Sequence, residues 1–271
     1  MKKLDNIAIV VRSSGENTSE ELVKILEKNK KENDPLIILN SIEPFSDKLY
    51  NSLVKSLELS KKFSIIIDAD ILVRDGFVNK VKHLTKTLPL NNSGFGIKVF
   101  DYIYNRPRYR GIHVYRTSCI ESILPFYPLE KGLLRPEKYV KEKLKKEKKL
   151  EWNNNHSEYV GGVHDFYQYN KDIVYKMYIR ASREKGDIKL IKEIASVNNK
   201  IEKESIYLGL DLALKGENIG NDKELFFKKN KPKINDVNYS HNKIPKYFNF
   251  VLYKNLINHY GFSRSLFKSL F

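Results

Sequence analysis

The chain has 271 residues, 41% of them hydrophobic and 30% charged, a composition typical of a globular protein that excludes collagen-like and wholly disordered chains. Its one cysteine, Cys119, excludes an internal disulfide and a multi-cysteine zinc site, which favours a reducing compartment. Lys and Arg number 49 against 33 Asp and Glu, and the formal net charge of +16 favours an anionic partner: nucleic acid, lipid headgroups or a phosphorylated small molecule.

Short apolar runs alternate with helical patterns over the first quarter of the chain. Three runs, β-branched and bounded by polar residues, predict buried strands at residues 6–11, 36–40 and 63–70. Between them, Thr18 and Glu21 form a capping-box pattern, and leucines at every fourth position mark a helix at about 47–60. This alternation predicts parallel βαβ units, in which ligands bind beyond the carboxyl ends of the strands.

The remaining sequence is mainly helical in pattern, with a pair of strands near its start. We expect a helix at about 76–86, strands at 94–104 and 111–115, a charged helix at 136–150 and a helix from Asp165 to about Arg183. There is neither an internal repeat nor a Gly/Ser linker. The sequence therefore predicts one α/β domain over residues 1–240, a mostly parallel sheet flanked by helices, followed by a helical, basic and aromatic C-terminal extension at 241–271.

The strongest chemical signal is Asp68-Ala69-Asp70, at the end of the most apolar strand. Two carboxylates at i and i+2 on an extended chain point the same way and repel each other unless a cation lies between them. A hard divalent cation suits carboxylate oxygens and also binds phosphates. The pattern therefore favours metal and phosphate chemistry, and its alternative is a polar strand end at which Asp68 caps a turn.

The run from Ile7 to Val78 resembles the nucleotide-binding half of the GT-A-fold glycosyltransferases, in particular the broad family 2-like group. In that group an Asn precedes the Asp-x-Asp by about fifteen residues, and here Asn51 lies 17 residues before Asp68. The chain departs from the group after the second strand, where Asn40 and Ser41 replace the usual acidic residue.

The resemblance implies a Rossmann-like GT-A fold with a nucleotide-sugar half at about 1–100 and an acceptor half at about 100–240. It implies transfer of a sugar from a nucleotide-diphosphate sugar to the hydroxyl of a glycan or lipid-linked acceptor, in cell-surface polysaccharide or glycolipid synthesis. Mn²⁺ or Mg²⁺ would bind the diphosphate. Asp70 is then a metal ligand, and Arg12, Asn51 and Asp68 contact the donor.

A second constellation is Gly161-Gly162-Val163-His164-Asp165. The glycines permit close backbone approach to a ligand, and His164 and Asp165 fall at the predicted N-terminus of the long helix. By resemblance, His164 completes the metal shell and Asp165 is the catalytic base. The alternatives are that Asp165 is only a helix cap, or that the base is Glu158 or Asp101.

Basic residues form two further features. The segment around Tyr109 contains Arg106, Arg108 and Arg110, which could bind phosphate or remain a solvated loop. The extension at 241–271 interleaves basic and aromatic residues, so it either lies on an anionic membrane surface or packs on the domain as a helix. No run of the chain reaches the roughly 18 apolar residues of a membrane span. We expect a cytoplasmic protein, with peripheral contact to the inner membrane face if the tail binds lipid.

Two other function classes compete with the glycosyltransferase. A nucleic-acid-binding protein would use the net positive charge, but the sequence matches neither a zinc finger nor an RNA-recognition signature, which disfavours nucleic acid as the partner. A metal-dependent nucleotidyltransferase shares the sheet-edge carboxylates but normally has a Gly-rich loop after the first strand. Ser13-Ser14-Gly15 is a poor match to such a loop.

Overall fold

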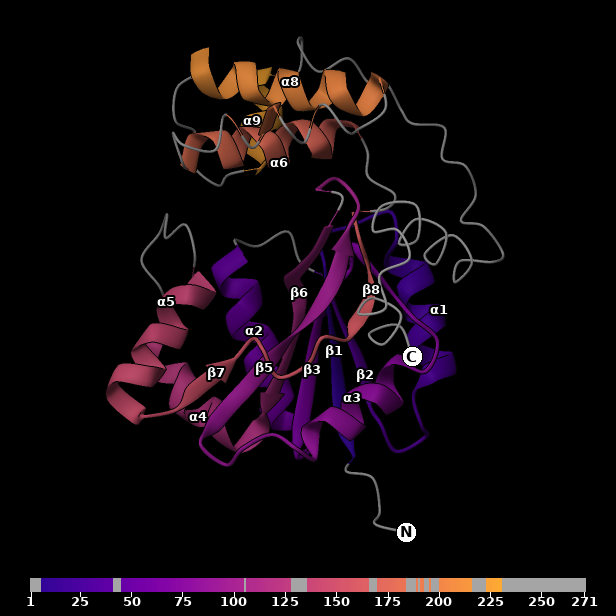
Figure 1. Cartoon of the computed structure of the whole chain (residues 1–271), viewed down its shortest axis with the longest axis vertical. Coiled ribbons are helices and arrows are strands. Elements are labelled where there is room, and N and C mark those ends of the chain that lie inside the picture. The colour runs from indigo at the N-terminus through magenta and orange to yellow at the C-terminus, as the bar shows by residue number, and fades with distance from the viewer. Residues whose placement is uncertain are drawn as a thin grey trace. The chain divides into compact units, whose positions relative to one another are not determined.

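The computed structural model describes residues 6–40, 45–104, 106–127, 136–165, 170–183, 189, 191–192, 195, 200–215 and 223–230. These residues form two compact units (Figure 1). The sheet unit comprises the described residues within 6–102 and 106–165, and the helical unit comprises Ile103, Tyr104 and the described residues from Asn170 onward. The expected division into a donor half, an acceptor half and an extension stays a prediction.

Within the described residues, the sheet unit is built on eight strands: β1 Ile7–Ser13, β2 Leu36–Asn40, β3 Phe63–Asp68, β4 Ile71–Val73, β5 Asn92–Asp101, β6 Arg106–Arg116, β7 Glu151–Asn153 and β8 Val160–His164. Their order is β2-β1-β3-β6-β5-β8-β4, and β7 also pairs with β5. The predicted α/β fold class is confirmed. The sheet is mixed, because β6 runs antiparallel to both β3 and β5, and β4 runs antiparallel to β8.

Strand direction decides which strand ends meet at one edge. β1 is parallel to β2 and β3, and β5 is parallel to β7 and β8. Because β6 is antiparallel to both β3 and β5, these two strands run in the same direction. The carboxyl ends of β1, β2, β3, β5 and β8 therefore lie at one edge of the sheet, the edge where α/β proteins bind their ligands.

Helices cover both faces of this sheet: α1 Ser19–Asn29, α2 Phe45–Glu58, α3 Phe77–Thr85, α4 Ile120–Ile123 and α5 Pro136–Lys143. α1 packs on α3 and β4, whereas α2 packs on β1 and α4. A buried cluster joins Leu53 of α2, Ile120 of α4 and Val140 of α5 to Val10 and Ile66 of the sheet, so these three helices share one face. The two covered faces explain why β1 and β3 are almost continuously apolar.

A buried ion pair connects helix α3 to the turn before β2. Lys82 of α3 contacts Asp34, and the two side chains are 1% and 0% exposed. Asp34 also accepts hydrogen bonds from the backbone N–H groups of Ile7 and Lys31. The start of β1, the turn before β2 and α3 are thus held by one carboxylate whose burial is compensated by a charge and two N–H donors.

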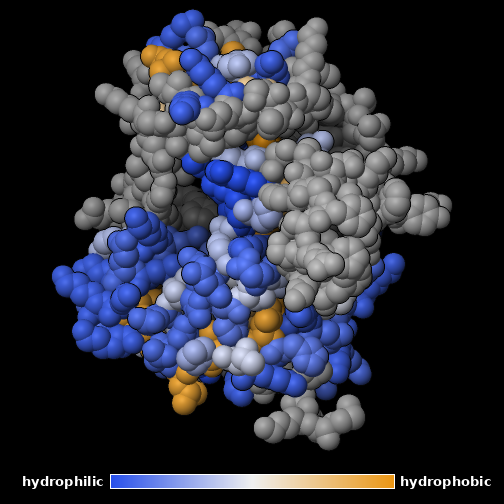
Figure 2. Space-filling model, in the orientation of Figure 1, coloured by the Kyte–Doolittle hydropathy of each residue, from blue (hydrophilic) through white to orange (hydrophobic). Residues whose placement is uncertain are grey.

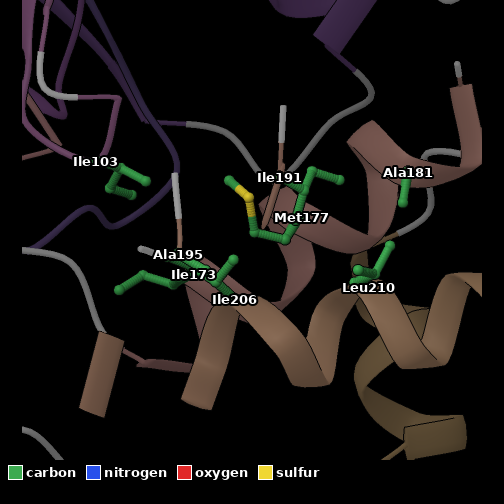
Figure 3. Close-up of a cluster of buried hydrophobic side chains, with 8 residues drawn as sticks. All are labelled: Ile103, Ile173, Met177, Ala181, Ile191, Ala195, Ile206 and Leu210. Carbon is green, nitrogen blue, oxygen red and sulfur yellow. The ribbon is translucent and has the colours of Figure 1, made fainter. Parts of the chain in front are cut away.

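The helical unit is described by α6 Asn170–Arg183, α8 Lys200–Lys215 and α9 Lys223–Asn230. Figure 3 shows its main apolar cluster: Ile103, Ile173, Met177, Ala181, Ile191, Ala195, Ile206 and Leu210. A Cβ on Gly209 of α8 would lie 2.4 Å from the carbonyl oxygen of Val174, so glycine permits the close approach of α8 to α6. The second cluster packs Tyr178 against Phe226 of α9.

Two expected helices differ in the structure. α6 begins at Asn170 rather than at Asp165, and residues 160–164 form the strand β8. In place of the charged helix expected at 136–150, the structure has α5, which ends at Lys143, followed by a π-helical turn at Leu144–Lys148. On the face shown in Figure 2, the surface over α5 is mostly hydrophilic.

The extension at 241–271 lies outside the described residues, so its contact with a membrane stays a prediction. Among the residues that are described, no helix combines the length and the apolar character needed to cross a lipid bilayer.

Candidate active site

Four strands bring polar residues to the carboxyl edge of the sheet. Arg12 of β1 pairs in register with Asp68 of β3, and Asp101 of β5 pairs with His164 of β8. These positions belong to the sheet unit. The parallel register thus gathers residues that are far apart in the sequence at the place where a ligand is expected.

The turn Asp68-Ala69-Asp70 joins β3 to β4 and is fixed by its backbone. The Ala69 N–H donates to the carbonyl oxygen of Arg12 at 2.9 Å, and the Asp165 N–H donates to the carbonyl oxygen of Asp70 at 3.1 Å. The Thr18 hydroxyl donates to the Ala69 carbonyl at 2.6 Å. Thr18 is at the N-cap position of α1, as the sequence predicted, but its side chain bonds this turn rather than the helix. Segments from β1, α1 and β8 thus hold the two aspartates in place.

His164 lies among three carboxylates. Its Nε2 is 3.4 Å from Asp70 Oδ2, and its Nδ1 is 3.4 Å from Asp101 Oδ2 and 3.2 Å from Asp165 Oδ2. The imidazole is 7% exposed, and the side chains of Asp101 and Asp165 are 0% and 3% exposed. Burial alone would lower the pKa of His164, but Asp165, Asp70 and Asp101 outweigh it and raise the pKa to about 10.

His164 lies in a strand rather than at the N-terminus of a helix, contrary to the sequence expectation. His164 ends β8, and Asp165 follows with φ of 61°, a left-handed conformation that Asp tolerates better than most residues. Gly161 and Gly162 are packed closely against other protein atoms. A Cβ on Gly161 would lie 2.7 Å from Ile97 Cγ2, and one on Gly162 would lie 2.4 Å from the Leu72 carbonyl oxygen. Both glycines are therefore needed for packing within the sheet.

Three of these side chains can hold a metal ion. Asp70, His164 and Asp165 each offer one ligand atom, and these atoms lie within 4.8 Å of one another. Carboxylate oxygens with one imidazole nitrogen suit Mn²⁺ or Mg²⁺ better than a soft cation. Asp101 lies beside the imidazole of His164 and adds a further negative charge, which a divalent cation would offset. The residues present therefore fit a divalent metal ion.

Asp68, which precedes this cluster in the turn, contacts Arg12. Arg12 donates from Nε to Asp68 Oδ1 at 2.8 Å, and its Nη2 lies 2.7 Å from the same oxygen. Its Nη1 lies 3.5 Å from Glu137 Oε1 on α5. Burial raises the pKa of Asp68, as do Asp70 and Glu137, to about 6, although Arg12 and His164 act in the opposite direction.

Two arginines from the start of β6 line Asp101. Arg108 Nη1 lies 3.6 Å and Arg110 Nε lies 3.9 Å from Asp101 Oδ2. Burial would raise the pKa of Asp101, but its contacts with His164, Arg110 and Arg108 lower the pKa below its ordinary value. Asp101 is therefore a buried anion held between an imidazole and two guanidinium groups.

All the predicted site residues except Asn51 lie at the carboxyl edge of the sheet. Asp68, Asp70, His164 and Asp165 come together, and Arg12 lies buried beside Asp68. Asn51 is exposed on α2, and its donor contact stays a prediction. Of the two alternative bases, Asp101 is in the cluster.

Glu158, the other alternative base, is 74% exposed and pairs with Lys98. Glu137 was not predicted as a site residue. It stands at the start of a lysine-rich helix, and nothing in the local pattern distinguishes it from Glu142 or Glu147.

A scan against models of protein families finds no match for the chain, and a search of curated proteins finds none either. Solved structures do resemble it. One is a glycosyltransferase involved in the glycosylation of the major capsid of PBCV-1, at 12% identity and a TM-score of 0.41, covering 60% of this chain and 96% of that chain. Another is S. aureus TarS 1–349 in complex with UDP-GlcNAc, at 12% identity and a TM-score of 0.41, covering 77% and 71%.

A cytidylyltransferase from Leptospira borgpetersenii is similar at 14% identity and a TM-score of 0.35, covering 70% of this chain and 94% of that chain. All three TM-scores lie below 0.5, so the function proposed next depends on the site of this chain.

Proposed function

We propose that this protein is a metal-dependent glycosyltransferase that takes a sugar from a nucleotide-diphosphate donor and transfers it to an acceptor hydroxyl. The observation that supports this most directly is the cluster of Asp70, His164 and Asp165, which adjoins Asp68 through a fixed turn at the carboxyl edge of the sheet. A divalent ion held there would supply charge stabilisation for the departing diphosphate.

Asp70 and His164 are the proposed metal ligands. The raised pKa of His164 keeps both ring nitrogens protonated in the metal-free chain. To bind a divalent ion, the imidazole would release the proton of Nε2, which faces Asp70, and keep the proton of Nδ1, which faces Asp101 and Asp165. Metal-binding histidines generally donate their second ring N–H to a carboxylate, which fixes the tautomer and the ring orientation. Asp101 fits this positioning role because it is fully buried and anionic.

We assign donor binding to Asp68 together with Arg108 or Arg110. Asp68 directly precedes the metal ligand Asp70 in the turn, and the two arginines line the same edge of the sheet next to Asp101. Guanidinium groups bind phosphate through directed N–H donors, which suits a nucleoside diphosphate.

Asp165 is the proposed base that accepts the proton of the acceptor hydroxyl. A general base must lie within hydrogen-bond reach of that hydroxyl, and Asp165 is adjacent to the metal ligands. Its position also allows direct metal ligation. The Asp165→Asn variant separates the roles: loss of a base lowers donor turnover and leaves Mn²⁺ affinity unchanged, whereas loss of a ligand weakens Mn²⁺ binding.

The central test is the Asp70→Asn variant, which keeps the side-chain shape and removes the charge. We expect turnover of nucleotide-diphosphate sugars with Mn²⁺ to fall at least about 100-fold, the scale on which one electrostatic group contributes to catalysis. Circular dichroism should show an unchanged fold. Asp75→Asn, an exposed aspartate after β4, is the matched control and should keep wild-type turnover.

Undiminished donor turnover by Asp70→Asn would contradict the metal assignment. If the wild-type chain instead releases pyrophosphate from a nucleoside triphosphate and a sugar phosphate, the activity is that of a nucleotidyltransferase.

A further inference from the structure

A buried ionic network connects α5 to the end of β3. Arg12 is 2% exposed, and it directs Nε and Nη2 at Asp68 Oδ1 while Nη1 points to Glu137. One guanidinium group thus lies between two carboxylates that come from a strand end and from the first turn of a helix. Within this network the two negative charges exceed the one positive charge.

Glu137 has a second partner on the sheet. Its Oε1 lies 3.2 Å from Nε2 of His113, which is 9% exposed and pairs in register with Ile66 of β3. Burial lowers the pKa of His113, although Glu137 acts in the opposite direction. Glu137 therefore contacts His113 of β6 on one side and Arg12 of β1 on the other.

The charge of Glu137 affects how Arg12 contacts Asp68. A buried guanidinium with one carboxylate partner draws that carboxylate into the closest two-point contact, because an uncompensated buried charge is costly. With Glu137 present, Nη1 has a carboxylate of its own at an ion-pair distance of 3.5 Å, and Asp68 is engaged through Oδ1 alone. The second oxygen, Oδ2, makes no contact with Arg12, and the Asp68 side chain is 28% exposed.

We propose that Glu137 is a positioning residue that, by sharing the charge of Arg12, holds Asp68 in the orientation in which it binds the nucleotide-diphosphate donor. Arg12 then acts through Asp68 rather than by touching the donor. This inference rests on the proposed function, since it takes Asp68 as a donor-binding residue. It assigns to α5 a part in forming the site that its lysine-rich sequence does not suggest.

The test compares Glu137→Gln with Glu142→Gln, an exposed glutamate of the same helix. Two affinities are measured by calorimetry at a temperature where all variants are folded: that for Mn²⁺ alone, and that for UDP, GDP, CDP or ADP with Mn²⁺. Glu137→Gln should weaken nucleoside-diphosphate binding about tenfold and change Mn²⁺ affinity less than twofold. Glu142→Gln should match the wild-type chain in both. If Glu137→Gln changes neither affinity, or lowers both equally, the inference is overturned.

A double-mutant cycle tests the network without any ligand. Asp68→Asn, Glu137→Gln and the double variant are compared by urea unfolding, and the unfolding equilibrium constant of the double variant should depart at least fivefold from additivity. Additive effects would overturn the inference. A wild-type chain that binds none of the four nucleotides contradicts the proposed function, and the cycle still decides whether Glu137 and Asp68 are coupled through Arg12.

Discussion

At the scale of single residues, the site depends on backbone conformations that few side chains allow. Gly111 of β6 has φ of 60°, and a Cβ there would lie 2.5 Å from Ile71 Cδ1 and 3.0 Å from Asp68 Oδ2. The absence of a side chain at Gly111 therefore leaves the space that Asp68 occupies. Asp165, one of the three candidate metal ligands, adopts a similar φ of 61°. The proposed donor site thus includes two residues with left-handed backbone.

Gly111→Ala should displace Asp68 as well as strain β6. We expect the free energy of unfolding to fall by about 2 to 4 kcal/mol, from a left-handed alanine together with a steric clash, and nucleoside-diphosphate affinity with Mn²⁺ to fall with it. Gly76→Ala is the control, because Gly76 has φ of 73° but a Cβ there would meet no atom within 4 Å. It should lose about 1 kcal/mol and retain full affinity. Equal losses in the two variants, measured by urea unfolding and calorimetry, would contradict this account of Gly111.

The sequence predicted those site residues whose signal is local. Asp68 and Asp70 follow an apolar strand, and their place at the sheet edge follows from the βαβ pattern. Glu137 carries no such signal, because its role depends on Arg12 and His113, which tertiary packing brings to it. Residues whose contacts are distant in sequence are not specified by spacing alone.

At the scale of elements, β8 shows how burial overrides local propensity. The pair Gly161-Gly162 indicates a turn in isolation, yet it lies within a strand because β4 and β5 approach too closely for side chains. The predicted helices that carry strong apolar periodicity, α1 and α2, are present close to their expected positions. Periodicity therefore predicted the helices, and the sheet's close packing determined β8.

The packing of α5 changes the pKa of one of its lysines. Lys141 places its Nζ 3.9 Å from the centre of the Trp152 ring, near Glu137, Arg12 and His113. Burial lowers the pKa of Lys141, and so does Arg12, to about 8, although Glu137 acts in the opposite direction. The folded chain thus binds this proton more weakly than the unfolded chain, in which the lysine titrates near its ordinary pKa of 10.5.

It follows that the contribution of Lys141 to stability rises between about pH 8 and pH 10.5 and is least favourable below pH 8. Lys141→Met should raise the free energy of unfolding by about 1 to 2 kcal/mol at pH 7, a value reduced for partial solvent screening, and this gain should shrink by pH 10. Lys138→Met, at a lysine 65% exposed on the same helix, should show no such dependence on pH. Urea unfolding at pH 7 and pH 10 measures the stability of both variants. If Lys141→Met raised the free energy of unfolding equally at the two pH values, Lys141 would not be the titrating group.

At the scale of the whole molecule, a strongly basic chain surrounds a site rich in carboxylates. The formal net charge is +16, yet Asp68, Asp70, Asp101 and Asp165 gather at one edge of the sheet. A uniformly basic nucleic-acid surface would not place four aspartates at its centre. A divalent ion would convert this edge into a site for a diphosphate, while the remaining positive charge attracts anions from a distance.

Binding through a metal ion and binding through surface lysines and arginines depend differently on salt. This difference separates a nucleotide-sugar enzyme from a nucleic-acid-binding protein. Binding of a nucleoside diphosphate through Mn²⁺ is a short-range contact, so between 50 and 200 mM KCl we expect its affinity to fall by less than about fivefold. EDTA or Asp70→Asn should abolish it. Single-stranded DNA held only by lysines and arginines should lose roughly 50- to 100-fold over the same range, as expected for four to five phosphate contacts, and should be indifferent to EDTA. DNA affinity that persists at 200 mM KCl and disappears in Asp70→Asn would mean that the aspartate cluster serves nucleic acid, and the glycosyltransferase proposal would then be wrong.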